Sequence, residues 1–207
     1  MKQVIRITAL FALAMIIMQA PMAQQRLQLN INYNIATPIG ATFRDYINKT
    51  SFRGAQGSVL YGINNHFSVG VQASYNDFYQ KYGRQVYKAT DGSDISVVPS
   101  NTLQSVPVLV KGEYSFLNKG LVKPYIGLGA GIHFVDYDQY LGEFEYDKHF
   151  TKAAFTGDAG LMVPFRRSSN YGFRLGTSYQ LMPFKEESIK NLDSWDVQAG
   201  VSIPLSK

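Results

Sequence analysis

Seven titratable residues recur on one side of the alternating segments that make up most of this 207-residue sequence. Successive side chains of an extended strand point to opposite faces, so these residues share one surface. Charges of both signs can neutralise one another there, whereas an isolated buried charge would be costly. The predicted lumen charge network is Lys111, Glu113, His133, Lys152, Asp158, Arg174 and Asp196. Our hypothesis is a salt-bridged plug of Glu113, Lys152, Asp158, Arg174 and Asp196.

The three histidines, His66, His133 and His149, do not indicate a metal site, because no two of them share metal-ligand spacing. The sequence has no cysteine, which removes thiolate ligands and a thiol nucleophile. No Ser/His/acid set is completed around His149. We therefore expect no catalytic residues, no metal and no cofactor.

Eight segments with a period of two carry the charged residues, and turn-forming residues separate them. Pro107 interrupts the fourth segment, where it predicts weak or bulged pairing. The segments lie near 26–37, 52–63, 67–76, 103–116, 123–134, 151–165, 171–181 and 194–205.

The fifth segment, KPYIGLGAGIHF, shows the alternation most clearly. One row is apolar and consists of Pro124, Ile126, Leu128, Ala130, Ile132 and Phe134. The opposite row consists of Tyr125, Gly127, Gly129, Gly131 and His133. Three glycines give up packing on their face, which is tolerable if that face looks into a crowded or wet interior. The apolar row must then meet either a protein core or lipid.

The connections between segments sort by length. Those after the first, third, fifth and seventh segments are long, near 38–51, 77–102, 136–150 and 182–192, and the others are short. In an up-and-down barrel, alternate connections lie at the same rim. The sequence therefore predicts an all-β fold, an eight-stranded antiparallel up-and-down β-barrel.

Lipid is favoured over a soluble core as the surroundings of the apolar rows. A soluble lipocalin-like barrel would place apolar residues inside and charges outside, but here Gly, Ser, Asn and Gln dominate the polar face. Charged residues are only 17%, and there are 14 Tyr and 13 Phe. The aromatic residues fall mostly near the ends of the apolar rows, as at bilayer interfaces. The net charge of +5 is spread without a Lys/Arg cluster, so no nucleic-acid partner is expected.

Residues 1–23 have the order of a secretory signal peptide. Lys2 and Arg6 precede an apolar run from Ile7 to Met18, and small residues end at Ala23. The apolar run is shorter than the ~20 residues that a membrane-spanning helix needs. We expect a cleaved signal peptide at 1–23 and a transmembrane β-barrel at 24–207.

The sequence resembles small outer-membrane β-barrels of the OmpA/OmpX-like, porin-family type. Beside the signal peptide, the resemblance rests on three stretches, KPYIGLGAGIHF, GDAGLMVPF at 157–165 and the alternating run Trp195–Leu205. It implies location in the outer membrane of a Gram-negative bacterium, contact with lipid and lipopolysaccharide, and insertion by the barrel-assembly machinery. Family members usually finish on an aromatic residue, whereas this sequence finishes with Pro204, Leu205, Ser206 and Lys207.

Three roles remain open. The first is a structural, porin-like or surface-interaction role with a lumen largely closed by inward polar side chains, since eight strands enclose little space. The second is an adhesin or ligand-binding barrel that acts on an extracellular ligand through the loop aromatics Tyr79, Tyr82, Tyr87, Tyr137, Tyr140, Phe144 and Tyr146. The third follows from the resemblance alone and is a lipid-modifying enzyme that uses His149; we expect no enzyme.

Overall fold

The computed structural model describes residues 27–88, 94–117, 119–141, 144–166, 171–186 and 189–205. The expected signal peptide at 1–23 lies outside these residues and stays a prediction. Among the described residues, no helix has the length and apolar character that a membrane-spanning helix requires.

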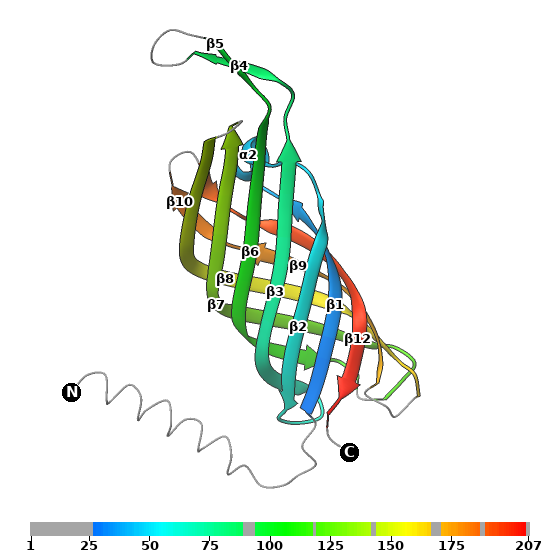
Figure 1. Cartoon of the computed structure of the whole chain (residues 1–207). Helices are drawn as coiled ribbons and strands as arrows, with labels where there is room; N and C mark the ends of the chain where they lie inside the picture. Colours follow the sequence, from blue (N-terminus) through cyan, green and yellow to red (C-terminus); the bar gives the residue numbers. More distant parts are fainter. Residues whose placement is uncertain are drawn as a thin grey trace, which may run out of the picture.

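Within the described residues, eight strands close into one antiparallel barrel in the order β1-β12-β9-β8-β7-β6-β3-β2 (Figure 1). Each barrel strand pairs with the previous and the next barrel strand along the chain, and β12 closes onto β1. The predicted up-and-down topology is therefore confirmed. The barrel strands are β1 (Leu27–Pro38), β2 (Ser51–Gly62), β3 (Phe67–Lys81), β6 (Pro99–Ser115), β7 (Lys123–Leu141), β8 (Phe144–Pro164), β9 (Gly172–Leu181) and β12 (Ser194–Pro204).

Smaller elements lie at the rim that carries the longer connections. Helix α2 (Ala41–Tyr46) follows β1, and β4 (Gln85–Lys88) pairs with β5 (Asp94–Val97) beyond the end of β3. A second small pair, β10 (Pro183–Glu186) and β11 (Ile189–Asn191), precedes β12. Figure 1 shows the β4–β5 hairpin standing beyond the barrel, while α2 lies at its mouth.

The two rows of β7 face in the predicted directions. Leu128 is 74% exposed on the outer surface, whereas His133 is fully buried inside. The same division holds along the other strands, where the apolar row is outward and the Asn, Gln, Ser and charged row is inward. The interpretation that lipid, and not a protein core, meets the apolar rows is thus in agreement with the observed faces.

Four strands extend further toward the loop rim than the sequence pattern suggested. The predicted loop at 136–150 is wrong, because β7 continues to Leu141 and pairs with β8 from Phe144 onward. The predicted loop at 77–102 is likewise too long, since β3 continues to Lys81 and β6 begins at Pro99. Alternation continues through these stretches with polar and aromatic residues on the outer face, so the period persists where the apolar signal ends.

Pro107 has the predicted effect on one side of its strand. Between β6 and β3, the recorded partners pass from Val108–Ala73 to Ser105–Asn76, which leaves a gap at the proline without a shift in register. On the other side, Pro107 pairs with His133 of β7 in a continuous ladder. Because proline lacks a backbone donor, one of its two neighbours loses a hydrogen bond.

The extended parts of four strands form a projecting sheet, which we define as residues 77–81 of β3, 99–105 of β6, 135–141 of β7 and 144–150 of β8. By contrast, β2 pairs with β3 only up to Gly54–Asn76, and β9 pairs with β8 only up to Leu181–Phe155. The barrel is therefore taller on this side, as Figure 1 shows for β6, β7 and β8.

Candidate functional site

Four charged side chains meet in the barrel interior and form what we call the ion network: Lys111, Glu113, Asp158 and Arg174. Lys111 Nζ lies 2.8 Å from Asp158 Oδ2 and 3.6 Å from Glu113 Oε2. Arg174 donates from both terminal nitrogens to the two oxygens of Glu113, at 3.1 Å and 2.7 Å. All four residues are buried. Two cations and two carboxylates thus balance within one bonded group, which satisfies charges that could not be buried singly.

Glycines on the inner face of β7 make space for this group. Gly127 pairs with Glu113 on one side and Asp158 on the other. A Cβ atom at Gly127 would lie 2.6 Å from Asp158 Oδ1 and 2.8 Å from Lys111 Cε. The absence of a side chain at this position is therefore what lets Lys111 reach Asp158 across the intervening strand.

Tyr125 supports Arg174 from the other side. The guanidinium carbon lies 3.9 Å from the centroid of the Tyr125 ring, in a cation–π contact. A Cβ atom at Gly160 or Gly176 would come within 2.5 Å or 2.6 Å of the Tyr125 hydroxyl, so these glycines clear the space for the ring. The arginine is held between a carboxylate and an aromatic face.

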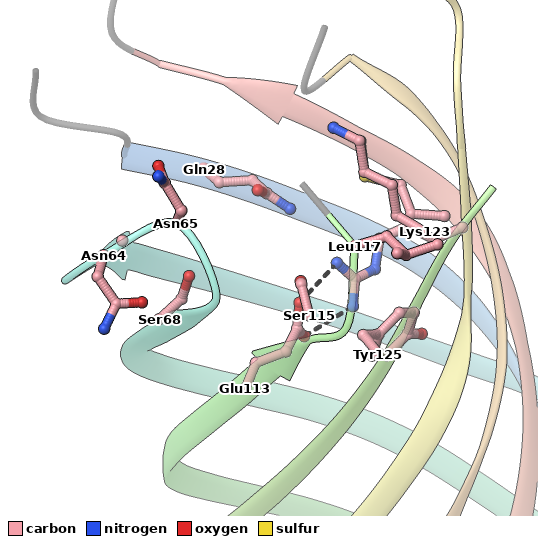
Figure 2. A pocket seen from close by; sticks show the side chains of 12 residues that line it. Gln28, Asn64, Asn65, Ser68, Glu113, Ser115, Leu117, Lys123 and Tyr125 are labelled. Carbon is pink, nitrogen blue, oxygen red and sulfur yellow. Dashed lines mark hydrogen bonds and ion pairs between the residues drawn. The ribbon is translucent and has the colours of Figure 1, made fainter. Parts of the chain in front are cut away.

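Glu113 and Arg174 of the ion network line a small polar pocket at the short-turn rim, with a volume of about 60 Å³. Figure 2 shows Glu113 and Tyr125 among the side chains that line this pocket, with dashed lines running from Glu113 to its cationic partner. The pocket is lined by Gln28, Gly62, Asn64, Asn65, Ser68, Glu113, Ser115, Leu117, Lys123, Tyr125, Met162 and Arg174. The Arg174–Glu113 pair therefore lines the pocket on this side of the barrel.

Three members of the predicted lumen charge network lie elsewhere. Lys152 is six residues from Asp158 on β8, about 20 Å along the strand, and its Nζ lies 5.8 Å from the ring centroid of Phe150. Asp196 accepts hydrogen bonds from Gln180 and, at 2.9 Å, from Ser194. The five-residue plug as a whole therefore stays a hypothesis. The rise along β8 separates Lys152 from Asp158, whereas Asp196 lies in the same row as Asp158, two strands away, and is bonded to Gln180 and Ser194.

His133 lies above the ion network, toward the loop rim. Its Nε2 is 2.7 Å from Ser105 Oγ, and both residues are completely buried. The Ser105 hydroxyl also lies 4.0 Å from Met182 Sδ. This pair is enclosed by the barrel wall and contributes to the polar filling of the lumen.

A buried apolar cluster, which we call the apolar plug, lies at the loop rim, and the sequence analysis did not predict it. It consists of Phe43, Ile47, Phe78, Leu103, Val135, Met182 and Leu192, all of them buried. Phe43 packs edge-on against Phe78 with ring centroids 5.2 Å apart. The available signal was the change of the inward row from polar to apolar at Phe78, Leu103 and Val135. Nothing in the six-residue helix α2 itself indicated that it would enter the barrel.

Hydrogen bonds tie α2 to the strands around it. Asn101 donates to the Tyr46 carbonyl at 3.1 Å, and the Asn48 backbone amide donates to Gln80 Oε1 at 2.7 Å. The Tyr82 hydroxyl also donates to the Tyr46 carbonyl, at 2.5 Å. Burial, followed by the neighbouring Tyr137, raises the pKa of Tyr46, whose ring stacks on Tyr137 at 4.6 Å. Burial likewise raises the pKa of Tyr82.

Four of the seven predicted loop aromatics have described side chains, and they fall into two groups. Tyr82 and Tyr137 pack around α2, as the previous contacts show. Tyr79 and Tyr140 are exposed on the outer face of the projecting sheet. The side chains of Tyr87, Phe144 and Tyr146 lie outside the described part of the structure.

The histidines outside the lumen have ordinary partners. His66 Nδ1 lies 2.8 Å from the Ser115 carbonyl, and its ring stacks on Tyr114. His149 Nδ1 lies 2.6 Å from Asp136 Oδ1 on the outer surface. Among the described residues, no group of three His, Asp or Glu side chains is arranged to hold a metal ion.

The outer surface carries an apolar belt with polar residues above it. On β7 the apolar row runs from Pro124 to Phe134 and then changes to Asp136. Ten residue steps at ~3.4 Å, tilted by ~40°, give a height of about 26 Å, which matches the ~25 Å band of outer-membrane barrels. Exposed aromatic residues mark both edges of this belt: Tyr33, Tyr75, Phe134, Tyr179 and Trp195 toward the loop rim, and Phe67, Tyr114, Phe165, Tyr171 and Phe173 toward the turns.

These features define a transmembrane β-barrel of the bacterial outer-membrane class, with a lipid-facing belt and an ion-paired interior. The family model for the outer membrane protein beta-barrel domain matches residues 8–203, so the chain belongs to that family. Family membership supports the predicted location in the outer membrane of a Gram-negative bacterium.

Two solved structures of outer-membrane proteins are similar to this chain. Neisserial surface protein A is 18% identical, with a TM-score of 0.58, over 87% of this chain and 97% of that chain. The N-terminal β-barrel domain of Pseudomonas aeruginosa OprF is 15% identical, with a TM-score of 0.44, over 87% of this chain and 100% of that domain. No curated protein matches the sequence closely enough to count as a relative.

Proposed function

We propose that this outer-membrane barrel does not conduct and acts at the cell surface, where it anchors the projecting sheet. The observation that supports the proposal is the presence of two buried groups inside the barrel. On this proposal the ion network blocks the turn-side half of the lumen, and the apolar plug blocks the loop rim.

The ion network supports closure because its members come from three strands. Lys111 and Glu113 lie on β6, Asp158 on β8 and Arg174 on β9. The bonded group therefore crosses the interior instead of lining one wall. Eight strands enclose a space just wide enough for side chains to fill, so a bridging group of this size leaves no continuous water path.

Planar-bilayer recording tests closure. The wild-type protein is expected to give no large, steady conductance, and such a conductance would contradict the proposal. Because the two closures are independent, Arg174→Ala alone is not expected to open the lumen. Conductance should rise only when Arg174→Ala is combined with Phe43→Ala and Ile47→Ala, which remove the apolar plug as well.

A surface-binding role is favoured by the outer face of the projecting sheet. The register places Tyr79 beside Thr102 and Lys81 beside Ser100, and Ser100 in turn beside Tyr140. Tyr79, Lys81 and Tyr140 are exposed. Aromatic rings among polar side chains give a binding surface large contact area at low entropy cost.

Adhesion of cells that display the protein tests this surface role. The double variant Tyr79→Ser, Tyr140→Ser should reduce adhesion, while Tyr82→Phe, whose ring faces α2, should not. Unchanged adhesion in the double variant would remove the projecting sheet as the binding surface and leave a structural role. Contact with lipopolysaccharide and insertion by the barrel-assembly machinery stay predictions, as does the lack of enzymatic activity.

A further inference from the structure

A groove crosses the lipid-facing surface over β7, β8, β9 and β12 and has a volume of about 310 Å³. Its floor is made by the small outward residues Gly157, Ala159 and Thr177. On one side stand Ile126 and Leu128, and on the other stand Tyr179 and Trp195. The volume is roughly ten times the ~30 Å³ of one water molecule in the liquid, so about ten groups of methylene size fit into it.

The strand register explains the shape of the groove. Leu128, Gly157 and Tyr179 form one row across three strands, and Trp195 continues it on β12. In the adjacent row, Ala159 pairs with Thr177. The two rows have small side chains in the middle and large side chains at the ends, so the groove is about two residues wide.

Packing within the protein does not require the glycine at the centre of the groove. A Cβ atom at Gly157 would have only Leu128 Cδ2 nearby, at an ordinary 3.7 Å. At the inward Gly131, by contrast, a Cβ atom would lie 2.1 Å from the Val108 carbonyl oxygen. The small residue in the groove therefore leaves space on the outer surface, where something else can fill it.

The two outward hydroxyl groups at the groove are bonded within the protein. The Thr177 hydroxyl donates to the Asp196 carbonyl at 2.9 Å, which leaves its methyl group for the groove. The Tyr179 hydroxyl donates to Asp193 Oδ2 at 3.3 Å, and the Tyr179 ring meets Trp195 edge-on with centroids 6.4 Å apart. The groove thus presents hydrocarbon and aromatic surface, and its aromatic end is held in place.

We propose that this groove holds one acyl chain of an outer-leaflet membrane lipid. The groove is continuous with the apolar belt, so lipid chains already surround it. Its aromatic end lies at Trp195, the first outward residue of β12 at the loop rim, which is the external side in outer-membrane barrels. A chain therefore enters from the outer leaflet and runs past Gly157 toward Leu128.

The single tryptophan of the sequence provides the probe, because Trp195 lines the groove. Wild-type protein, Gly157→Leu and Gly57→Leu are reconstituted in phosphatidylcholine vesicles with brominated acyl chains, which quench tryptophan on contact. Gly57 is the matched control. It is an outward glycine of β2 with open space around its Cβ position, and three strands separate it from β8 in either direction around the barrel.

Filling the groove should displace the bound chain from the indole. Quenching in Gly157→Leu is expected to fall to about half of the wild-type value, since one of the two lipid-facing sides of the ring is then covered by protein. Gly57→Leu should be quenched as strongly as the wild type. Heat-dependent gel migration establishes that each variant is folded, and Ala159→Leu replaces Gly157→Leu if the latter fails to fold.

Two outcomes would overturn the proposal. Equal quenching in the wild type and in the groove-filling variant would mean that no chain occupies the groove. The other outcome is that a second copy of the protein fills the groove. Wild-type quenching would then depend on the protein-to-lipid ratio. Gly157→Cys, in a chain that has no other cysteine, would also cross-link into dimers.

Discussion

Replacing Arg174 by methionine tests whether the ion network stabilises the barrel. The change leaves Lys111 between Glu113 and Asp158, so the buried group passes from neutral to a net charge of −1. Breaking a buried ion pair costs ~3–5 kcal/mol, and the remaining contact between Lys111 and Glu113 places this case near 3 kcal/mol. Loss of the cation–π contact with Tyr125 adds about 1 kcal/mol, for a total of roughly 4 kcal/mol.

A double-mutant cycle measures this effect by urea unfolding in lipid vesicles, followed by Trp195 fluorescence and by heat-dependent gel migration. Glu113→Gln alone leaves Arg174 and Lys111 facing one carboxylate. In the double variant the neutral Lys111–Asp158 pair remains, with its 2.8 Å contact. The double variant should therefore be less destabilised than the sum of the two single variants, by about 2 kcal/mol.

The exposed pair of Arg53 and Asp77 supplies the matched control. Its atoms are 3.3 Å apart, but the arginine side chain is 70% exposed. Arg53→Met is expected to cost less than ~1 kcal/mol, because exposed ion pairs contribute little. The reasoning would be refuted if Arg174→Met cost no more than this control, or if the two single changes added within ~0.5 kcal/mol.

Three further variants test the apolar plug, the space for the ion network and the buried hydroxyl of Tyr46. Phe43→Ala should lower the free energy of unfolding by roughly 3 kcal/mol through the cavity left in the apolar plug; no change would mean that α2 does not hold the mouth shut. Gly127→Ala should destabilise the barrel by forcing Lys111 and Asp158 apart, whereas Gly57→Ala, with open space around its Cβ, should not; equal stabilities in urea would refute this. Burial raises the pKa of Tyr46, so above pH 10 the unfolded chain loses the Tyr46 proton more readily than the folded protein does, and the free energy of unfolding falls. Below pH 10 this effect is absent. Tyr46→Phe should therefore reduce the loss of stability at alkaline pH.

Alternation in the sequence was sufficient to predict the barrel and its two faces. A period of two fixes which residues share a surface, so Leu128 and Gly127 could be assigned to opposite sides without a structure. The belt was predictable for the same reason, because lipid selects apolar and aromatic outward residues. The ends of the strands were not predictable in this way, because polar residues continue the alternation of β7 and β8 beyond the belt, to Leu141 and Phe144.

Pairing across the lumen could not be predicted from the sequence. Glu113 and Arg174 lie on β6 and β9, which are not adjacent, and two strands stand between them. Whether their side chains meet depends on the stagger and tilt of all the strands, which alternation does not specify. The sequence placed Lys152 and Asp158 on one face, but the rise along β8 assigns one to the ion network and the other to the vicinity of Phe150.

The two closures that we propose for the lumen have different physical origins, and this difference favours a permanently closed lumen over a gated one. Opening the turn-side half requires breaking buried ion pairs, whereas opening the loop rim requires moving Phe43 and Ile47 into water. A change in salt or pH that weakens charge contacts leaves the apolar plug in place, and α2 can move without disturbing Arg174. No single local event therefore makes a continuous path, and the parts of the molecule left to act outside are the projecting sheet and the lipid-facing belt.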